Sequence, residues 1–203
     1  MVAIERTALV LLAAGRGTRF GGSGAKLEQV APGGPLGLQA ATALRDLPFA
    51  ERIAVTGEAR LDVESLGFRR VANHHPARGL AHSVRLGVAC AQECGVEAVS
   101  IVLADMPRVT AAHVGRLFDA FADADSVISS SDGVSRKPPA LFGANHFDAL
   151  MRLKGDAGAR ELLRGGRHVL ASPAELIDVD TPEDLQRLRA LEATAPANCA
   201  NHA

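Results

Sequence analysis

The sequence predicts one three-layer α/β/α domain with a mostly parallel sheet, and three features of the chain support this fold class. Short apolar runs rich in β-branched residues recur, segments with helical periodicity separate most of them, and the runs are continuous rather than alternating. Continuous runs are typical of parallel strands that helices cover on both faces. With 203 residues, 47% of them hydrophobic, the chain can bury one substantial core, which we expect over residues 1–193.

The elements follow in order along the chain. The apolar runs predict strands at Thr7–Leu12, Arg52–Thr56, Phe68–Ala72, Ala98–Leu103 and Ser126–Ser130. Helical periodicity predicts helices near Pro35–Leu47, Ala81–Cys94, Thr110–Phe121, Ala144–Met151, Ala157–Arg164 and Pro182–Glu192. Turn residues followed by an apolar stub predict an irregular or antiparallel excursion at residues 131–142. Residues 194–203 have too little apolar bulk to pack, so we expect a disordered tail.

Composition argues against several classes of function. The formal charge of −1 and the absence of Trp and Tyr favour neither a nucleic-acid nor a membrane partner. No apolar run reaches the roughly 18 residues that span a bilayer, and we therefore expect a cytoplasmic protein. The three cysteines match neither a disulfide framework nor a metal knuckle, and the scattered histidines do not indicate zinc.

A glycine-rich turn follows the first predicted strand, in the stretch ALVLLAAGRGTRFGGSGAK over residues 8–26. Gly15 and Gly17 can adopt positive φ angles and let backbone N–H groups point at an anion, while Arg19 and Lys26 supply positive charge. The turn lacks the Lys-Ser/Thr pair of a P-loop, and a phenylalanine stands where a dinucleotide fingerprint needs its third glycine. It is nevertheless suited to holding a polyphosphate.

Carboxylates follow later in the chain. Asp105 comes directly after a predicted strand and just before a proline, so its side chain is expected to project into the crevice at the strand ends, although organising that turn would explain it too. Asp180 precedes Thr-Pro-Glu-Asp, which is also an ordinary helix start, so capping is an alternative role. Asp178, predicted on a strand, should face the same side as Asp180 and is a substitute candidate.

Five segments, taken together, resemble the MobA-like family of nucleotidyltransferases. They are the motif from Leu12 to Lys26, NHHPARGLAHSVRLGV from Asn73, LADMP from Leu103, RLKGDAGAR from Arg152 and DVDTPEDL from Asp178. They follow in family order over roughly residues 7 to 190, and the chain looks most similar to the molybdenum cofactor cytidylyltransferases of that family. The resemblance implies a Rossmann-like fold of the nucleotide-diphospho-sugar transferase type.

The resemblance also implies roles for single residues. Lys26, Arg19 and Asp105 would be catalytic, and Asp105 and Asp180 would hold Mg²⁺ through their carboxylates. The implied nucleotide-binding residues are Leu12, Ala13, Ala14, Gly15, Gly17, Thr18, Asn73, Gly79 and Ser83. Helix capping is the alternative role for Ser83. Asp156 and Arg160 would lie near the acceptor, although a cap and a surface arginine explain the same residues.

The reaction implied is transfer of a nucleoside monophosphate, CMP from CTP, to a phosphorylated small acceptor such as molybdopterin, with release of pyrophosphate. The Ala-Ala-Gly form of the loop is the reason for choosing CTP. A molybdoenzyme or its chaperone would be the protein partner, whereas the oligomeric state is not implied. The chain has Arg136-Lys137-Pro138-Pro139 where the family typically reads R-G-H-P. Two alternatives stay open: a sugar or polyol phosphate as acceptor, and a nucleotide-binding cofactor-delivery module without turnover.

Overall fold

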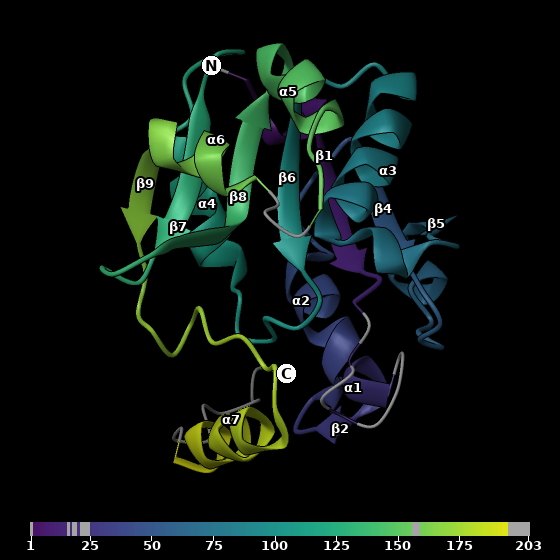
Figure 1. Cartoon of the computed structure of the whole chain (residues 1–203). Helices are drawn as coiled ribbons and strands as arrows, with labels where there is room; N and C mark the ends of the chain where they lie inside the picture. The colour runs from purple at the N-terminus through teal and green to yellow at the C-terminus, as the bar shows by residue number, and fades with distance from the viewer. Residues whose placement is uncertain (1, 16, 18–19, 21–24, 156–158, 195–203) are drawn as a thin grey trace, which may run out of the picture.

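A seven-stranded sheet forms the centre of the computed structural model, which describes residues 2–15, 17, 20, 25–155 and 159–194. The strand order is β5-β4-β1-β6-β8-β7-β9 (Figure 1). The strands are β1 (Thr7–Ala13), β4 (Glu51–Thr56), β5 (Arg69–Ala72), β6 (Ala98–Leu103), β7 (Val127–Ser131), β8 (Arg136–Gly143) and β9 (Arg167–Leu170). Among these, β8 alone runs antiparallel to its neighbours, so the mostly parallel sheet is confirmed.

Helices cover both faces of the sheet, as predicted. They are α2 (Leu36–Leu44), α3 (Leu80–Glu93), α4 (Ala111–Asp119), α5 (Phe147–Met151) and α6 (Arg160–Gly165). A short α1 (Ala25–Glu28) packs on α2, and α7 (Pro182–Thr194) lies below the sheet, where it packs with Ala31 and Leu36 (Figure 1). Single 3₁₀ turns occur at Ile4–Arg6, Glu64–Leu66, Pro76–Arg78 and Ala144–His146, and β2 (Val30–Ala31) and β3 (Gly34–Pro35) form a small hairpin. No described helix is both long and apolar enough to cross a membrane.

The central strand β1 is buried on both sides, which explains its continuous apolar sequence. Ala8, Val10 and Leu12 belong to the core cluster shared with α3, α5 and α6. The intervening residues of the strand face the other layer, in a cluster with α2 and α4. Because successive side chains of a strand point to opposite faces, seven buried residues in a row require a helical layer on each side.

Helix α3 packs unusually close to the sheet at Gly87. A Cβ built at this position would overlap Val10 Cγ1 of β1 and would lie 3.3 Å from Val55 Cγ2 of β4. This close approach places the first turn of α3 beside the carboxyl end of β1. The glycine-rich turn begins at the same end.

The predicted strands all form, with small changes at their ends, and the excursion at residues 131–142 is largely the antiparallel strand β8. One strand was missed and one expectation about the strands was wrong. Strand β9 was not predicted, and Asp178 lies in an irregular segment rather than on a strand. The predicted helix at Ala144–Met151 is a 3₁₀ turn followed by α5. Thr194, predicted as the first residue of a disordered tail, is instead the last residue of α7. The rest of that predicted tail, residues 195–203, lies outside the described residues.

Candidate active site

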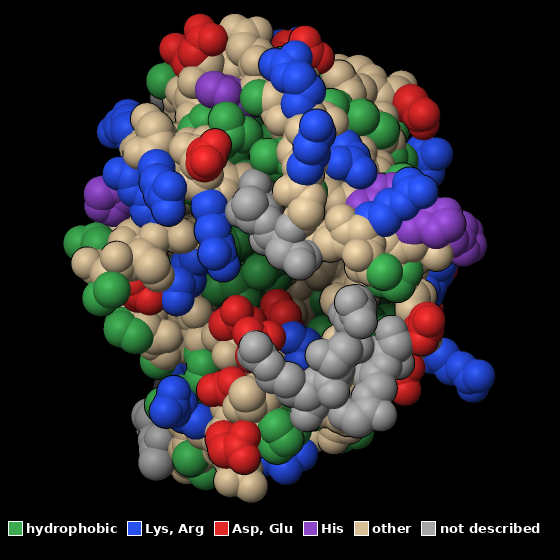
Figure 2. All heavy atoms as spheres, viewed as in Figure 1, with side chains coloured by type: hydrophobic (Ala, Val, Ile, Leu, Met, Phe, Trp, Pro, Cys, Tyr) green, Lys and Arg blue, Asp and Glu red, His purple; other side chains and the backbone are tan. Residues whose placement is uncertain are grey.

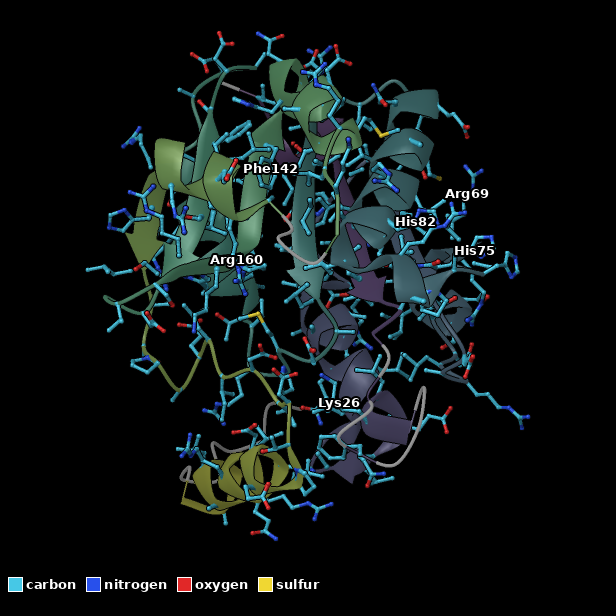
Figure 3. The ribbon with its side chains drawn as sticks, in the orientation of Figure 1. Lys26, Arg69, His75, His82, Phe142 and Arg160 are labelled. Carbon is cyan, nitrogen blue, oxygen red and sulfur yellow. The ribbon has the colours of Figure 1, made fainter. Side chains whose placement is uncertain are left out.

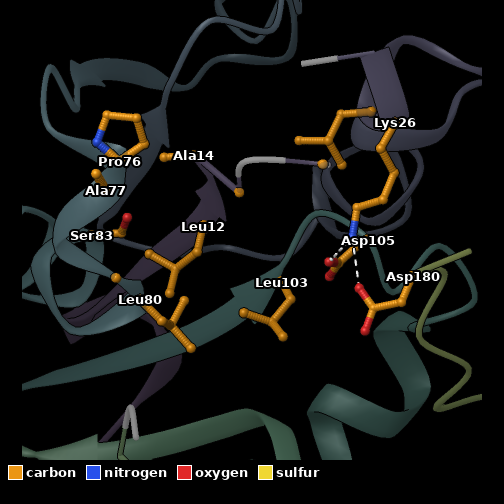
Figure 4. Close-up of a pocket in the computed structure, with 14 residues that line it drawn as sticks. Leu12, Ala14, Lys26, Pro76, Ala77, Leu80, Ser83, Leu103, Asp105 and Asp180 are labelled. Carbon is orange, nitrogen blue, oxygen red and sulfur yellow. Dashed lines mark hydrogen bonds and ion pairs between the residues drawn. The ribbon is translucent and has the colours of Figure 1, made fainter. Parts of the chain in front are cut away.

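A pocket of about 510 Å³ opens at the carboxyl ends of β1 and β6, where the parallel-sheet rule places ligands. Its lining includes many of the predicted site residues: Leu12, Ala14, Gly15, Gly17, Lys26, Gly79, Ser83, Asp105 and Asp180. Figure 4 shows Lys26, Asp105 and Asp180 on one side and Pro76, Ala77 and Ser83 on the other. The pocket therefore brings together the glycine turn, the start of α3 and the two carboxylates.

The glycine turn has the backbone freedom that its sequence suggests. Gly17 has a φ of 53°, a left-handed conformation that favours glycine. Gly15 is exposed at the pocket, and a Cβ there would meet no described atom within 4 Å. Gly15 and Gly17 both line the pocket. Thr18 and Arg19, the other residues predicted here, lie outside the described residues, as does Asp156.

Lys26 is the buried cation of the site. Its side chain is 7% exposed, and its Nζ lies 2.6 Å from Asp105 Oδ2 and 3.1 Å from Asp180 Oδ1. Burial on its own would lower the pKa of Lys26, but the neighbouring carboxylates outweigh burial and raise the pKa above its usual value. The ammonium is therefore charged at neutral pH and aimed at the acidic cluster (Figure 4).

Three carboxylates gather around this ammonium. One oxygen each of Asp105, Asp178 and Asp180 lies within 4.8 Å of the others. The Val179 N–H donates to the backbone oxygen of Asp105 over 3.0 Å, which fastens the irregular segment to the turn after β6. This one backbone bond brings acids about 75 positions apart in the sequence to a single point.

The cluster is electrostatically crowded at Asp178. Asp178 is exposed to water on one side, and partial desolvation on the other, together with the negative charges of Asp105 and Asp180, raises the pKa of Asp178 to about 7. A like charge within a few ångströms disfavours ionisation, whereas a cation would favour it. The cluster is therefore a place where additional positive charge is stabilising.

The donor set fits a small divalent cation. Octahedral Mg²⁺ holds oxygens at ~2.1 Å, which separates neighbouring oxygens by about 3 Å and opposite ones by about 4 Å. The three carboxylate oxygens are within 4.8 Å of one another, so closing by about 1 Å would bring them to such spacing. Asp105 Oδ1 is also buried and has no hydrogen-bond partner among the described residues. A buried carboxylate oxygen without a partner is suited to a metal or a bound donor.

The structure separates Asp180 from helix capping. Thr181 Oγ1 accepts from the Asp184 N–H over 3.2 Å, and Asp184 Oδ2 accepts from the Thr181 N–H over 3.0 Å. This reciprocal pair is a capping box for α7, with aspartate in place of the usual glutamate. The predicted helix start is thus confirmed, but its capping residue is Thr181, and the carboxylate of Asp180 reaches Lys26 instead.

Ser83 and Asn73 form a buried polar pair. Asn73 Nδ2 donates to Ser83 Oγ over 3.0 Å, and Asn73 Oδ1 accepts from the His75 N–H. The N-cap of α3 is Gly79, so the capping role considered for Ser83 is wrong. Ser83 lines the pocket whereas Asn73 does not, and Ala13 is buried in the core at 1% exposure. Asn73 therefore orients Ser83 from behind the pocket wall.

A second pocket of about 680 Å³ adjoins the first, and the two share Leu12, Leu80 and Leu103. It lies between β8, α6 and the ends of β1 and β6, and Asp178 stands in its lining. Its floor is apolar, from Val84, Ile101, Met106, Ala140, Phe142 and Leu163. Its other walls carry Arg136, Lys137, Arg160 and Arg164. Figure 2 shows the hollow in this face, with acidic and basic side chains around it.

The basic side chains of the second pocket differ from one another in their partners. Arg136 Nη1 donates to the backbone oxygens of Leu163, Arg164 and Gly166, at 2.5, 2.6 and 2.8 Å, and so fastens the end of α6. Lys137 pairs with Asp132 over 2.8 Å, and this pairing lowers the pKa of Asp132. Arg160 lines the pocket (Figure 3), and its predicted place near the acceptor stays a prediction.

Sequence reasoning missed Arg164 and the apolar floor. The signal for Arg164 was present, because Arg160 and Arg164 are spaced i and i+4 and thus share one helix face. The floor gave no such signal, because Ile101, Met106 and Phe142 come from different elements and read individually as core residues.

Residues 9–172 match the model of the MobA-like NTP transferase domain. The purine catabolism protein PucB of Bacillus subtilis is 37% identical over 118 residues, which cover 55% of this chain and 57% of PucB. The bifunctional protein GlmU of Maricaulis maris is 31% identical over 180 residues, which cover 83% of this chain and 39% of GlmU. The chain thus spans less than two thirds of either relative.

Solved structures agree on the fold. A nucleotidyl transferase from Methanothermobacter, Mth528, has a TM-score of 0.76 at 27% identity, covering 91% of this chain and 96% of that one. Rv0371c of Mycobacterium tuberculosis, in its complex with manganese, has a TM-score of 0.71 at 23% identity, covering 91% and 98%. With four fifths of its length matched by the family model and this fold, the chain belongs to the MobA-like NTP transferase domain family.

Proposed function

We propose that this chain is a nucleotidyltransferase that moves CMP from CTP to the phosphate group of a small acceptor and releases pyrophosphate. One observation carries the proposal. The cluster of Lys26 with three aspartates stands where two adjoining pockets meet, since Asp105 and Asp180 line the first pocket and Asp178 lines the second. Such a junction is where two substrates would need to exchange a phosphoryl group.

The first pocket suits the triphosphate. The glycine turn offers backbone N–H groups, and Lys26, with Arg19 beyond the described residues, supplies positive charge to the phosphoryl oxygens. Gly79 and Ser83 on the opposite wall are proposed to contact the nucleoside, together with Leu12, Ala14 and Gly15. The preference for CTP over other triphosphates is proposed on the Ala-Ala-Gly form of the turn alone.

A phosphate oxygen of the acceptor would attack the α-phosphorus. A new P–O bond forms as the bond to the β-phosphate bridge breaks, and pyrophosphate leaves with that pair of electrons. A phosphate nucleophile is already ionised at neutral pH, so alignment and charge stabilisation would supply the rate enhancement. Lys26, whose Nζ lies 2.6 Å from Asp105 Oδ2, is proposed to stabilise the negative charge that develops on the phosphoryl oxygens.

Asp105 and Asp180, with Asp178 as a further ligand, are proposed to hold Mg²⁺. When bound, the ion would neutralise triphosphate oxygens and help to orient them. The manganese of the Rv0371c complex belongs to that protein, and it supports a divalent ion here only through the shared fold.

The second pocket suits a phosphorylated acceptor with an apolar or flat body. Arg160 and Arg164 can receive the phosphate, and the floor beneath them is apolar. A sugar or polyol phosphate would bring hydroxyls that this floor cannot pair. A molybdopterin-like acceptor is therefore proposed over the sugar-phosphate alternative, with a molybdoenzyme or its chaperone as the protein that receives the product, in the cytoplasm.

The experiment is a thermal-shift screen of CTP, GTP, UTP and ATP with Mg²⁺, followed by pyrophosphate release with candidate acceptors. CTP at about a hundred times its dissociation constant should stabilise the fold by roughly 2.7 kcal/mol. Lys26→Ala and Asp105→Ala should abolish pyrophosphate release. A shift without turnover for every acceptor would favour the non-catalytic delivery module, and the absence of any shift would contradict the donor assignment.

A further inference from the structure

Lys26 contacts two of the three aspartates that are proposed to hold a divalent cation. Its ammonium contacts Asp105 Oδ2 and Asp180 Oδ1. These two residues belong to the three aspartates whose carboxylate oxygens lie within 4.8 Å of one another. Two cations held by the same pair of oxygens would lie within a few ångströms of each other, where their repulsion is large. The ammonium and a metal ion therefore cannot share these oxygens at low cost.

The surroundings let Lys26 leave. It is carried by α1, a helix of only four residues that follows the glycine turn, and it reaches the acids through a flexible four-carbon stem. The same side chain lines the first pocket, so it can turn towards an anion bound there. The backbone on which Asp105 and Asp180 stand is joined by the bond from the Val179 N–H to the Asp105 oxygen, which does not involve Lys26.

We propose that Lys26 is the resident counter-ion of the aspartate cluster and that it competes with a divalent cation for Asp105 and Asp180. This inference rests on the proposed function and gives the order of its binding steps. A triphosphate draws Lys26 away and so opens the aspartate cluster to the metal. Metal and triphosphate would then bind with positive cooperativity, because each removes what hinders the other.

A merely structural ion pair makes the opposite prediction for a neutral variant. If Lys26 only stabilises the fold, removing its charge leaves the acids disordered, and metal binding weakens or stays unchanged. If Lys26 is a competitor, removing its charge strengthens the binding of metal alone, although the same change impairs catalysis. Catalytic importance and metal affinity are thus expected to move in opposite directions.

The first test measures Mn²⁺ affinity by titration calorimetry or electron paramagnetic resonance, without nucleotide. Lys26→Met should bind Mn²⁺ at least tenfold more tightly than the unmodified protein, which corresponds to about 1.4 kcal/mol. Lys154→Met, the same change at an exposed site, should leave the affinity unchanged. Equal or weaker binding by folded Lys26→Met would overturn the proposal.

The second test uses the unmodified chain and does not depend on the folding of a variant. An amine-acetylating reagent should modify Lys26 slowly, because its ammonium is buried and paired, and Lys154 quickly. Saturating Mn²⁺ should accelerate acetylation of Lys26 at least fivefold without affecting Lys154, as peptide mass spectrometry would show. No acceleration at Lys26 would overturn the proposal.

These outcomes are separate from those of the proposed function. Pyrophosphate release by the unmodified protein does not require Lys26 to be a competitor, so it survives failure of both tests. Conversely, tighter Mn²⁺ binding by Lys26→Met supports the competition even if no acceptor yields pyrophosphate.

Discussion

Replacing Gly87 by alanine tests whether α3 is seated on the sheet as closely as the structure shows. The added Cβ would overlap Val10 Cγ1 and approach Val55 Cγ2 to 3.3 Å. Both contacts are methyl groups of buried valines, and a side chain branched at Cβ has little rotamer freedom with which to turn away. Either α3 must move outwards or β1 must distort.

The magnitude follows from two opposing effects. Overpacking a core costs up to about 3 kcal/mol, whereas replacing glycine by alanine inside a helix gains about 1 kcal/mol. Gly87→Ala should therefore lower the free energy of unfolding by about 2 kcal/mol, and the melting temperature by roughly 4–8 °C. The first turn of α3 lines the pocket proposed to bind the nucleotide, so any stabilisation by CTP should shrink as well.

Gly115 in α4 provides the matched control, because a Cβ there would meet no described atom within 4 Å. Gly115→Ala keeps only the gain in helix propensity and should stabilise the protein by about 0.5–1 kcal/mol. Urea unfolding of both variants, followed by circular dichroism, measures the difference. If Gly87→Ala proves as stable as Gly115→Ala, the close packing of α3 against β1 is refuted.

Three further predictions concern the site and its support. Asp180→Asn should keep the free energy of unfolding within about 0.5 kcal/mol, because Thr181 and not Asp180 caps α7. The same change should reduce pyrophosphate release at least tenfold, and unchanged release would count against a role of Asp180 in the reaction. Thr181→Val should do the reverse, lowering the free energy of unfolding by about 1 kcal/mol in urea and sparing release. Burial lowers the pKa of His113, so the unfolded chain binds more protons and stability should fall by up to ~1.4 kcal/mol per pH unit below about pH 6.5. Measurements of the free energy of unfolding at several pH values should show that His113→Gln loses this dependence on pH. The same dependence in His113→Gln and in the unmodified protein would contradict the prediction.

The last of these rests on a buried chain of hydrogen bonds. Arg116 Nη2 lies 2.8 Å from His113 Nδ1, and His113 Nε2 lies 2.7 Å from Ser130 Oγ. Ser130 Oγ in turn donates to the Pro139 oxygen. If Arg116 donates to Nδ1, the neutral ring carries its proton on Nε2 and donates to Ser130. Protonating the ring would set its second N–H against the Arg116 guanidinium, which is why acid should weaken the fold.

Much of the fold was predictable because each parallel strand is covered on both faces and so has a continuous apolar sequence. Strand β9 was missed because Arg167, His168 and Leu170 at the sheet edge leave it mostly exposed, without the apolar run that marks a buried strand. The stub at residues 131–142 was placed correctly, but its sequence did not fix its position between β6 and β7.

The site was predictable in its residue types and less so in its contacts. Strand ends and the family resemblance indicated Asp105 and Lys26, yet neither shows that the two form a buried ion pair. The capping of α7 by Thr181 rather than Asp180 depends on a side-chain rotation that the motif leaves open. The roles of Arg19 and Thr18 stay predictions.

The three leucines common to both pockets stand between two hollows that differ in some of their elements. The glycine turn contributes residues to the first hollow only, β8 and α6 contribute to the second only, and α3 contributes to both. Changes in β8 or α6 can thus alter the second hollow without replacing a residue of the first. A scaffold of this kind can exchange its second substrate in evolution while keeping its nucleotide chemistry intact.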